Sequence, residues 1–288
     1  MFKQKITNNQ RLLLVGTSFV LPWIIGYLVF TVYPIVYSLV LSVSDLDITM
    51  DGLSFAFSGI KYYRQALQED TKFSLYLVES VSYILYATPI IIVISLILAL
   101  MLNGKYRGRT FFRAVFFMPV VIMSGPVISE LLSKYRVDFS YSEPSMYNFL
   151  ISLPDIFSGP TMFVLENLVL VFWHSGVQIL LFLISLQHIT PELYEAAAID
   201  GAGSWEKFWK ITLPYVSPMV VLSAFYTIIE LANDSTNSVN TYIAERMMDI
   251  NGYYSFSTAM SWIYTVVLAL LLLVLYLIFM FFGKKRSD

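Results

Sequence analysis

Long stretches without a charged residue recur along the chain. Six runs contain no Asp, Glu, Lys or Arg, at residues 12–44, 80–104, 114–129, 167–190, 211–229 and 250–283. A helix of about 18–20 apolar residues crosses the roughly 30 Å of hydrocarbon in a bilayer. Five runs reach that length, and only 114–129, which contains Pro119 and Pro126, is shorter. The pattern predicts an all-α integral membrane protein with six transmembrane helices.

Composition supports a membrane protein and excludes several other classes. Hydrophobic residues make up 57% of the chain and charged residues 13%, against about 25% charged in soluble domains. One apolar run could be a buried helix of a soluble core, but six could not. The net charge of −2 gives no basis for nucleic-acid binding. With no cysteine, the chain cannot form disulfides or thiolate metal sites, and we expect no metal site.

Basic residues predict the orientation of the spans. They precede the first run, fill the loop after the second and end the chain: Lys3, Lys5, Arg11, Lys105, Arg107, Arg109, Arg113, Lys284, Lys285 and Arg286. The opposite segments, near 45–75, 130–163 and 234–257, mix acids with bases. The positive-inside rule therefore places both termini in the cytoplasm, in a multi-pass protein of the cell membrane. The first run is too long for a signal-peptide core, so we retain it as a span.

The most polar long stretch, ELYEAAAIDGAGSWEKFWKITLP, lies between the fourth and fifth runs on the predicted cytoplasmic side. Thr190 and Pro191 are typical of a helix start, which predicts a helix over 192–200. Gly201 and Gly203 then allow the backbone angles of a turn.

Ser204 is the expected N-cap of a second short helix over 205–212, which carries bulky aromatic residues. A helix–turn–helix with one small and one bulky side suits docking against another protein. The alternative is an amphipathic loop resting on lipid headgroups. Such loops are usually rich in Lys and Arg, whereas this one is net acidic, which favours a protein partner.

This segment resembles a known family motif. Glu195, Ala196, Ala197, Gly201 and the Ile-x-Leu-Pro that ends at 214 meet every position of E-A-A-x3-G-x9-I-x-L-P, the EAA loop of permeases of ATP-binding-cassette (ABC) importers. The resemblance implies the ABC-importer permease fold as a single domain over 1–288. It also implies that the loop at 190–214 couples to a separate ATPase, with Glu195, Ala196, Ala197 and Gly201 as its contact and turn residues.

The resemblance extends over much of the chain. Residues 21–42, 59–67, 102–122 and 180–214 look like the carbohydrate-uptake branch, and more narrowly like maltose- and glycerol-phosphate-type permeases. The implied partners are a second, different permease, an ATPase dimer, an extracellular solute-binding protein, membrane lipid and a carbohydrate, most simply an oligosaccharide. Two outer segments, 137–150 and 233–241, depart from the family pattern, which bears on the ligand rather than on coupling.

The chain lacks the residues for ATP hydrolysis. A phosphate-binding loop needs G-x4-G-K-[ST], and neither Gly104-Lys105 nor Gly283-Lys284 is followed by Ser or Thr. No metalloprotease or nucleophile-elbow motif is present. We therefore expect no catalytic residue and no cofactor in this chain, with ATP and Mg bound by partner ATPase subunits.

Polar residues inside the runs fall at helical spacing. The fourth run and the fifth, extended to 234, each carry one stripe, and the sixth repeats the pattern: Asn167, His174, Gln178 and Ser185; Ser223, Thr227, Glu230 and Asp234; Thr258, Ser261 and Thr265. For Ser and Thr we favour hydrogen bonding between helices. We interpret His174, Gln178 and Glu230 as lining a translocation pathway. Trp173 and Tyr226 beside them would suit the apolar faces of sugars.

Two other classes stay open. An ion-coupled secondary transporter would use paired intramembrane acids and inverted repeats, whereas this chain has no evident repeat and Glu230 is the only acid we place deep in a predicted span. A non-transporting membrane scaffold would have no reason to carry a complete coupling loop.

Overall fold

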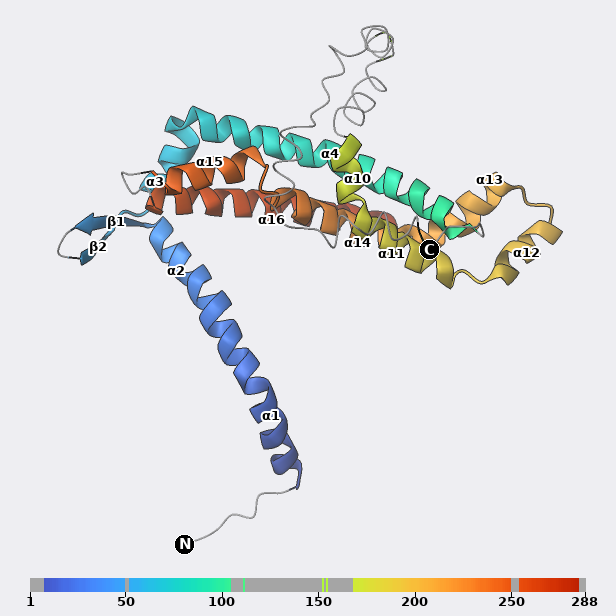
Figure 1. Ribbon diagram of the computed structural model, residues 1–288, viewed down its shortest axis with the longest axis horizontal. Coiled ribbons are helices and arrows are strands. Elements are labelled where there is room, and N and C mark those ends of the chain that lie inside the picture. The colour runs from blue at the N-terminus through green and yellow to red at the C-terminus, as the bar shows by residue number, and fades with distance from the viewer. Residues whose placement is uncertain are drawn as a thin grey trace. The chain divides into compact units, whose positions relative to one another are not determined.

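The computed structural model describes residues 8–49, 52–104, 168–249 and 254–284, together with 111, 152 and 154. The described chain is mainly helical and divides into two compact units, 1–75 with 242–266 and 76–241 with 267–288 (Figure 1). The third predicted span, Asn167 and the basic cluster at 105–113 lie outside the described residues.

The first unit begins with one nearly continuous helix. It comprises α1 (Asn8–Tyr27), the π-helix η1 (Leu28–Val32) and α2 (Tyr33–Ser42). Residues Gly16–Ser42 within it are long and apolar enough to cross a membrane. The unbroken apolar sequence explains this length, because every backbone N–H and C=O is satisfied inside the helix.

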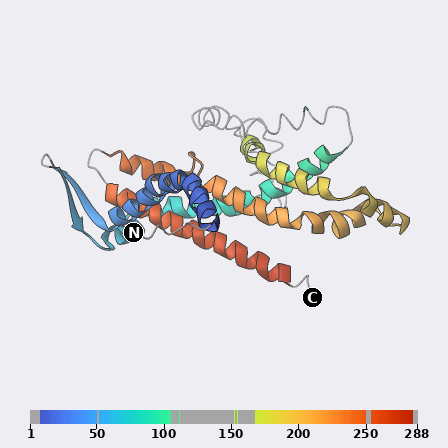
Figure 2. The same ribbon diagram turned by 90° about the horizontal axis from the view of Figure 1, so that it is seen from below.

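A β-hairpin follows that the all-α prediction missed. Strands β1 (Ser44–Thr49) and β2 (Gly52–Phe57) pair antiparallel with Thr49 opposite Gly52 (Figures 1 and 2). The signal was present, because Asp45 and Asp47 alternate with apolar residues ahead of an Asp-Gly dipeptide. The fold is therefore mainly rather than entirely α-helical.

Side-chain contacts join the hairpin to the short helix α3 (Lys61–Arg64), which follows it in the sequence. Asp45 accepts a hydrogen bond from the Tyr62 hydroxyl, and its Oδ2 lies 3.2 Å from Lys61 Nζ. The Tyr62 hydrogen bond lowers the pKa of Asp45, with burial opposing it and Lys61 adding to it. The π-helix η2 (Gln65–Glu69) continues from α3.

The side chain of Asp70 accepts hydrogen bonds from two helices. Its Oδ1 accepts a hydrogen bond from the Phe73 backbone N–H at 2.9 Å, which caps α4 (Thr71–Asn103). Its Oδ2 accepts a hydrogen bond from the Tyr242 hydroxyl at 2.8 Å, and Arg246 Nε donates to the same hydroxyl at 3.0 Å. Both residues belong to α15 (Ser238–Met247), which is therefore tied to the start of α4.

The second unit is a helical bundle. It includes α10 (Leu168–His174), α11 (Gly176–His188), α14 (Leu213–Ala232) and the greater parts of α4 and α16 (Tyr254–Lys284). Helices α11 and α14 lie side by side (Figures 1 and 2). Their buried apolar residues form a core with α4: Ile92, Ala99, Leu102, Ile179, Phe182, Leu183, Leu186, Val216 and Ala224.

Four described helices are long and apolar enough to span a membrane: Gly16–Ser42, Thr71–Asn103, Ser204–Ala232 and Tyr254–Phe281. A fifth is reached if the pair Gly176–His188 and Pro191–Ile199, bent by 62°, counts as one span. These helices agree with the predicted runs. The total of six stays a prediction, because 114–129 lies outside the described residues.

Candidate functional site

The two short helices predicted after the fourth run are present, and their cytoplasmic position stays a prediction. Helix α12 (Pro191–Ile199) begins after Thr190, whose extended backbone (φ −70°, ψ 139°) is that of an N-cap, with Pro191 in the first turn. The Thr190 hydroxyl makes no capping hydrogen bond, so the proline and the backbone mark the helix start. Glu195 and Ala196 are exposed on α12, and Ala197 is half-buried.

Gly201 makes the turn between the two helices. Its φ of +82° lies in the left-handed region, which among the described residues only Gly59 shares. The expected role of Gly201 is thus consistent with its backbone. Gly203 lies in the same turn, but its φ of −72° is one that any residue can adopt.

Gly203 is the N-cap of α13 (Ser204–Lys207), and its backbone N–H donates to Glu206 Oε2 at 3.2 Å. The side chain three residues into the helix thereby supplies a partner for an exposed N–H. Ser204, the expected N-cap, is the first helical residue.

Helix α13 runs through the π-helix η3 (Phe208–Thr212) directly into α14. Pro214 lies just after η3, where the helix changes from π to α, and it does not interrupt the helix. Figure 1 shows α12 and α13 projecting from the ends of α11 and α14. Large apolar side chains are exposed on these two helices, with Ile199 at 87% and Trp205 at 73%.

Hydrogen bonds fasten this loop to both neighbouring spans. The hydroxyls of Tyr194 and Thr212 are 2.8 Å apart, which joins α12 to the start of α14. The Tyr215 hydroxyl donates to the carbonyl of His188 at 3.3 Å, and Ser185 Oγ donates to the carbonyl of Tyr215 at 3.4 Å. We call the Tyr194–Thr212 contact the loop clamp.

A buried polar cluster lies between α10–α11 and α14. Gln178 is fully buried, and its Nε2 donates to Thr227 Oγ1 at 2.8 Å and to Glu230 Oε2 at 3.3 Å. Thr227 in turn donates to the carbonyl of Ser223 at 2.7 Å. The fourth and fifth stripes predicted from spacing thus face each other at Gln178 and Glu230.

His174 joins the same cluster with two carboxyl groups. Its Nδ1 lies 3.2 Å from Glu230 Oε1 and its Nε2 lies 3.3 Å from Asp234 Oδ2. The Nδ1 contact has ion-pair distance without hydrogen-bond alignment. Asp234 follows the end of α14, and its Oδ1 also accepts from the N–H and hydroxyl of Thr236, both at 2.7 Å. Burial raises the pKa of Asp234, but the hydrogen bonds from His174 and Thr236 outweigh burial and hold it at about 2.

Three buried atoms of this cluster lack a hydrogen-bond partner within the described residues: His174 Nδ1, Gln178 Oε1 and Ser223 Oγ. A buried polar atom without a partner costs about 1–3 kcal/mol, and such atoms are available to a ligand. Trp173 and Tyr226 are half-buried in the same helices. Within the described ranges no group of three His, Cys, Asp or Glu could hold a metal ion.

Most Ser and Thr residues of the three predicted stripes make hydrogen bonds either within their own helix or to a neighbouring helix. Thr258, Ser261 and Thr265 each donate to the carbonyl four residues earlier in α16. Two of these residues link helices as we expected: Ser185 of α11 donates to a carbonyl of α14, and Thr227 of α14 accepts from Gln178 of α11.

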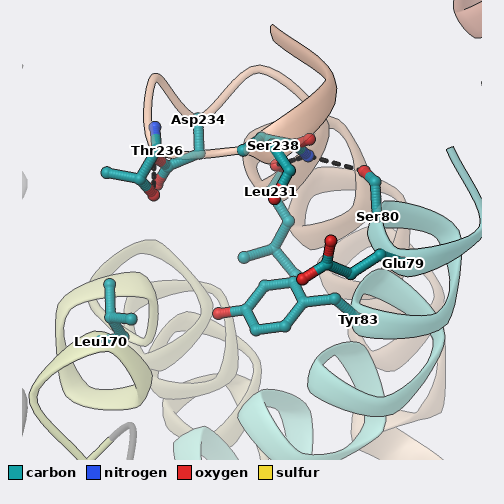
Figure 3. Close-up of a pocket in the computed structure, with 9 residues that line it drawn as sticks. Glu79, Ser80, Tyr83, Leu170, Leu231, Asp234, Thr236 and Ser238 are labelled. Atoms are coloured by element: carbon teal, nitrogen blue, oxygen red, sulfur yellow. Dashed lines mark hydrogen bonds between the residues drawn. The ribbon is translucent and has the colours of Figure 1, made fainter. Parts of the chain in front are cut away.

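A cavity that we did not predict from the sequence lies beside the cluster. About 130 Å³ in volume, it is lined by Glu79, Ser80, Tyr83, Leu170, Leu231, Asp234, Thr236, Asn237 and Ser238 (Figure 3). Asn237 Nδ2 donates to Ser80 Oγ at 2.8 Å and joins α4 to the segment after α14. Glu79, which directly precedes the second uncharged run, was the available signal.

Most of the chain is similar to known membrane transport proteins. Residues 72–287 match the family described as "Binding-protein-dependent transport system inner membrane component". The multiple sugar-binding transport system permease protein MsmF of Streptococcus mutans is 32% identical over 225 residues, covering 69% of this chain and 73% of that protein.

Two further similarities cover more of the chain. The probable ABC transporter permease protein YesP of Bacillus subtilis is 27% identical and covers 91% of this chain and 89% of its own. A chain of a bacterial alginate ABC transporter, solved with an alginate pentasaccharide-bound periplasmic protein, has the same fold with a TM-score of 0.61. It is 20% identical and covers 91% of this chain and 92% of that chain.

The family match spans most of the chain and includes the EAA loop, both faces of the buried cluster and the last apolar helix. This protein therefore belongs to the inner-membrane components of binding-protein-dependent transport systems, as a multi-pass membrane protein.

Proposed function

We propose that this chain is the permease subunit of an ABC importer that translocates a carbohydrate, most simply an oligosaccharide, delivered by an extracellular solute-binding protein. The observation that carries the proposal is the complete EAA loop held between two spans, with Gly201 in the left-handed conformation at its turn. The carbohydrate assignment is supported by the sugar named for the relative MsmF and by the polar and aromatic residues of the buried cluster.

The proposed assembly supplies what this chain lacks. A second, different permease would complete the pathway, and an ATPase dimer would bind ATP and Mg, so this subunit is not itself an enzyme. We propose one permease domain over 1–288 with six spans in membrane lipid and both termini cytoplasmic. The exposed Ile199 and Trp205 would then face the ATPase, with Glu195, Ala196 and Ala197 as the other contact residues.

The loop can transmit movement because it is continuous with a span. Helix α13 runs without a break into α14, and the loop clamp joins α12 to the same point. Helix α14 carries Thr227 and Glu230, which hold Gln178 of α11. A displacement of α12 and α13 would therefore reach the buried cluster through one rigid element.

Removing the loop clamp should weaken coupling. In Tyr194→Phe the ring remains but the 2.8 Å hydrogen bond to Thr212 is lost, which costs about 0.5–1.5 kcal/mol. We expect uptake per ATP hydrolysed to fall roughly two- to tenfold. Uptake and hydrolysis are measured on the same reconstituted complex, with Tyr215→Phe, which loses a longer bond to His188, for comparison. An unchanged ratio in Tyr194→Phe would mean that the clamp does not transmit movement.

The function itself is tested by reconstituting the permease pair, the ATPase and the binding protein in liposomes with labelled oligosaccharides. We expect uptake that needs ATP and the binding protein. Uptake driven by a proton or sodium gradient without ATP would favour a secondary transporter. An assembly that forms but transports nothing would favour a scaffold.

The topology can be tested with single cysteines because the chain has none of its own. Ile199→Cys and Phe57→Cys replace side chains that are 87% and 85% exposed. We expect an impermeant thiol reagent to label position 57 from outside and position 199 only after the membrane is opened. Cysteines at Arg107 and Tyr141 extend the test to predicted inner and outer positions outside the described residues. Labelling of position 199 or 107 from outside would overturn the six-span topology.

A further inference from the structure

The cavity beside the buried cluster has a distinctive charge. Glu79 of α4 and Asp234 after α14 both line it, and among the described residues none of the nine that line it is Lys or Arg (Figure 3). Glu79 is exposed, and Asp234 is ionised at neutral pH given its pKa of about 2. The cavity therefore presents two carboxylates to anything that enters it.

The groups behind the cavity do not cancel this charge. Asp234 Oδ2 lies 3.3 Å from His174 Nε2, and His174 Nδ1 lies 3.2 Å from a third carboxyl group, that of Glu230. Even a doubly protonated imidazole offsets only one of these acids. Among the described residues, three carboxyl groups thus lie in and behind the cavity with a single imidazole.

The remaining lining is suited to hydroxyl groups. Ser80, Thr236, Asn237 and Ser238 contribute hydroxyls and an amide, and Tyr83 contributes a ring (Figure 3). Carboxylates accept hydrogen bonds from ligand hydroxyls, and charged acceptors make stronger bonds than neutral ones. The volume of about 130 Å³ is well above the roughly 10–15 Å³ that holds one water. The site therefore has room for part of a polyhydroxylated ligand.

A carboxylate on the ligand would be repelled here. Like charges in partly desolvated surroundings interact unfavourably, and no described lining residue carries a positive charge that would neutralise a second anion. We infer that this cavity selects neutral saccharides and rejects sugar acids such as uronates. The inference rests on the proposed function and adds the charge class of the substrate.

A matched pair of probes isolates the charge. Trigalacturonate and its fully methyl-esterified form differ in three carboxylates and otherwise share a backbone; maltotriose and arabinotriose serve as further neutral probes. Binding to the purified permease–ATPase complex, without the binding protein, is measured by equilibrium dialysis. We expect at least one neutral probe to bind, and the acid to bind on the order of tenfold or more weakly than its ester.

Two variants make the test specific to the cavity. Glu79→Lys places a cation on the lining and should raise affinity for trigalacturonate by on the order of tenfold relative to the ester. Glu245→Lys makes the same charge change at an exposed acid of α15 that does not line the cavity, and it should leave the ratio unchanged.

The inference is overturned if the acid binds as tightly as its ester, if no probe binds, or if both variants shift the ratio equally. ATP-dependent uptake in liposomes separates these failures from that of the proposed function. If uptake occurs and the acid binds well, only the charge inference fails. If no ATP-dependent uptake occurs, the proposed function fails whatever the binding data show.

Discussion

A Gly201→Val variant is expected to insert and assemble normally but to lose most ATP-driven uptake. Gly201 has φ +82°, a conformation that side chains with a Cβ adopt at a cost of about 1–2 kcal/mol, and β-branched residues more reluctantly. A Cβ at Gly201 would meet nothing within 4 Å, so the strain is local to the backbone. A cost of this size shifts the loop away from its native turn by roughly 5- to 30-fold.

Gly203 provides a matched control two residues away. A Cβ at Gly203 would likewise meet nothing within 4 Å, but the φ of −72° there suits any residue. Gly203→Ala should therefore keep most uptake, and Gly201→Asn should retain more than Gly201→Val because Asn tolerates the left-handed region. Uptake and substrate-stimulated hydrolysis are measured together with copurification of the partner permease. Normal coupling in Gly201→Val would show that this loop is not the coupling element.

Reversing the charge of Glu195 tests the proposed contact between this loop and the ATPase. Glu195 is exposed on α12, so Glu195→Lys should not disturb the fold of this chain. If the residue faces the ATPase, hydrolysis and uptake should uncouple as in Gly201→Val. If uptake and substrate-stimulated hydrolysis both persist, Glu195 is not a contact residue.

Gln178→Leu and Glu230→Leu should each lower uptake about tenfold or more. Leu has nearly the volume of Gln, but it removes the 2.8 Å bond to Thr227 and the 3.3 Å bond to Glu230. Each polar group left without a partner, on the protein or on a sugar, costs about 1–3 kcal/mol, and 1.4 kcal/mol is a factor of ten. Glu230→Leu also removes the carboxyl group 3.2 Å from His174 Nδ1.

Ser185→Ala and Ser261→Ala are the controls for this pair. Ser185 makes a long 3.4 Å bond to the Tyr215 carbonyl, and Ser261 bonds within its own helix, so both should transport nearly normally. The melting temperature of the assembled complex is measured on all four variants. If Gln178→Leu and Glu230→Leu lose uptake only in proportion to lost complex, the cluster holds the helices together and the pathway lies elsewhere.

The sequence by itself determined the elements whose formation is local. An unbroken apolar run is helical in a membrane because no other backbone satisfies its own hydrogen bonds there, so 80–104 and 211–229 predicted most of α4 and α14. Fixed spacing placed Gln178 and Ser185 on one face of α11. The turn at Gly201 was likewise predictable, because glycine readily adopts the positive φ that this turn between two short helices has.

Only the tertiary structure decided which groups meet. His174 and Glu230 are 56 positions apart in the sequence, yet His174 Nδ1 lies 3.2 Å from Glu230 Oε1. Their spacing could not show this, because the distance depends on how α10 and α14 pack. The N-cap of α13 was predicted to be Ser204, whereas it is Gly203, whose N–H donates to the Glu206 side chain. The acidic cavity was hidden because its lining comes from α4, α10 and the turn after α14. Residues distant in sequence acquire a shared electrostatic field only once helix packing brings them together.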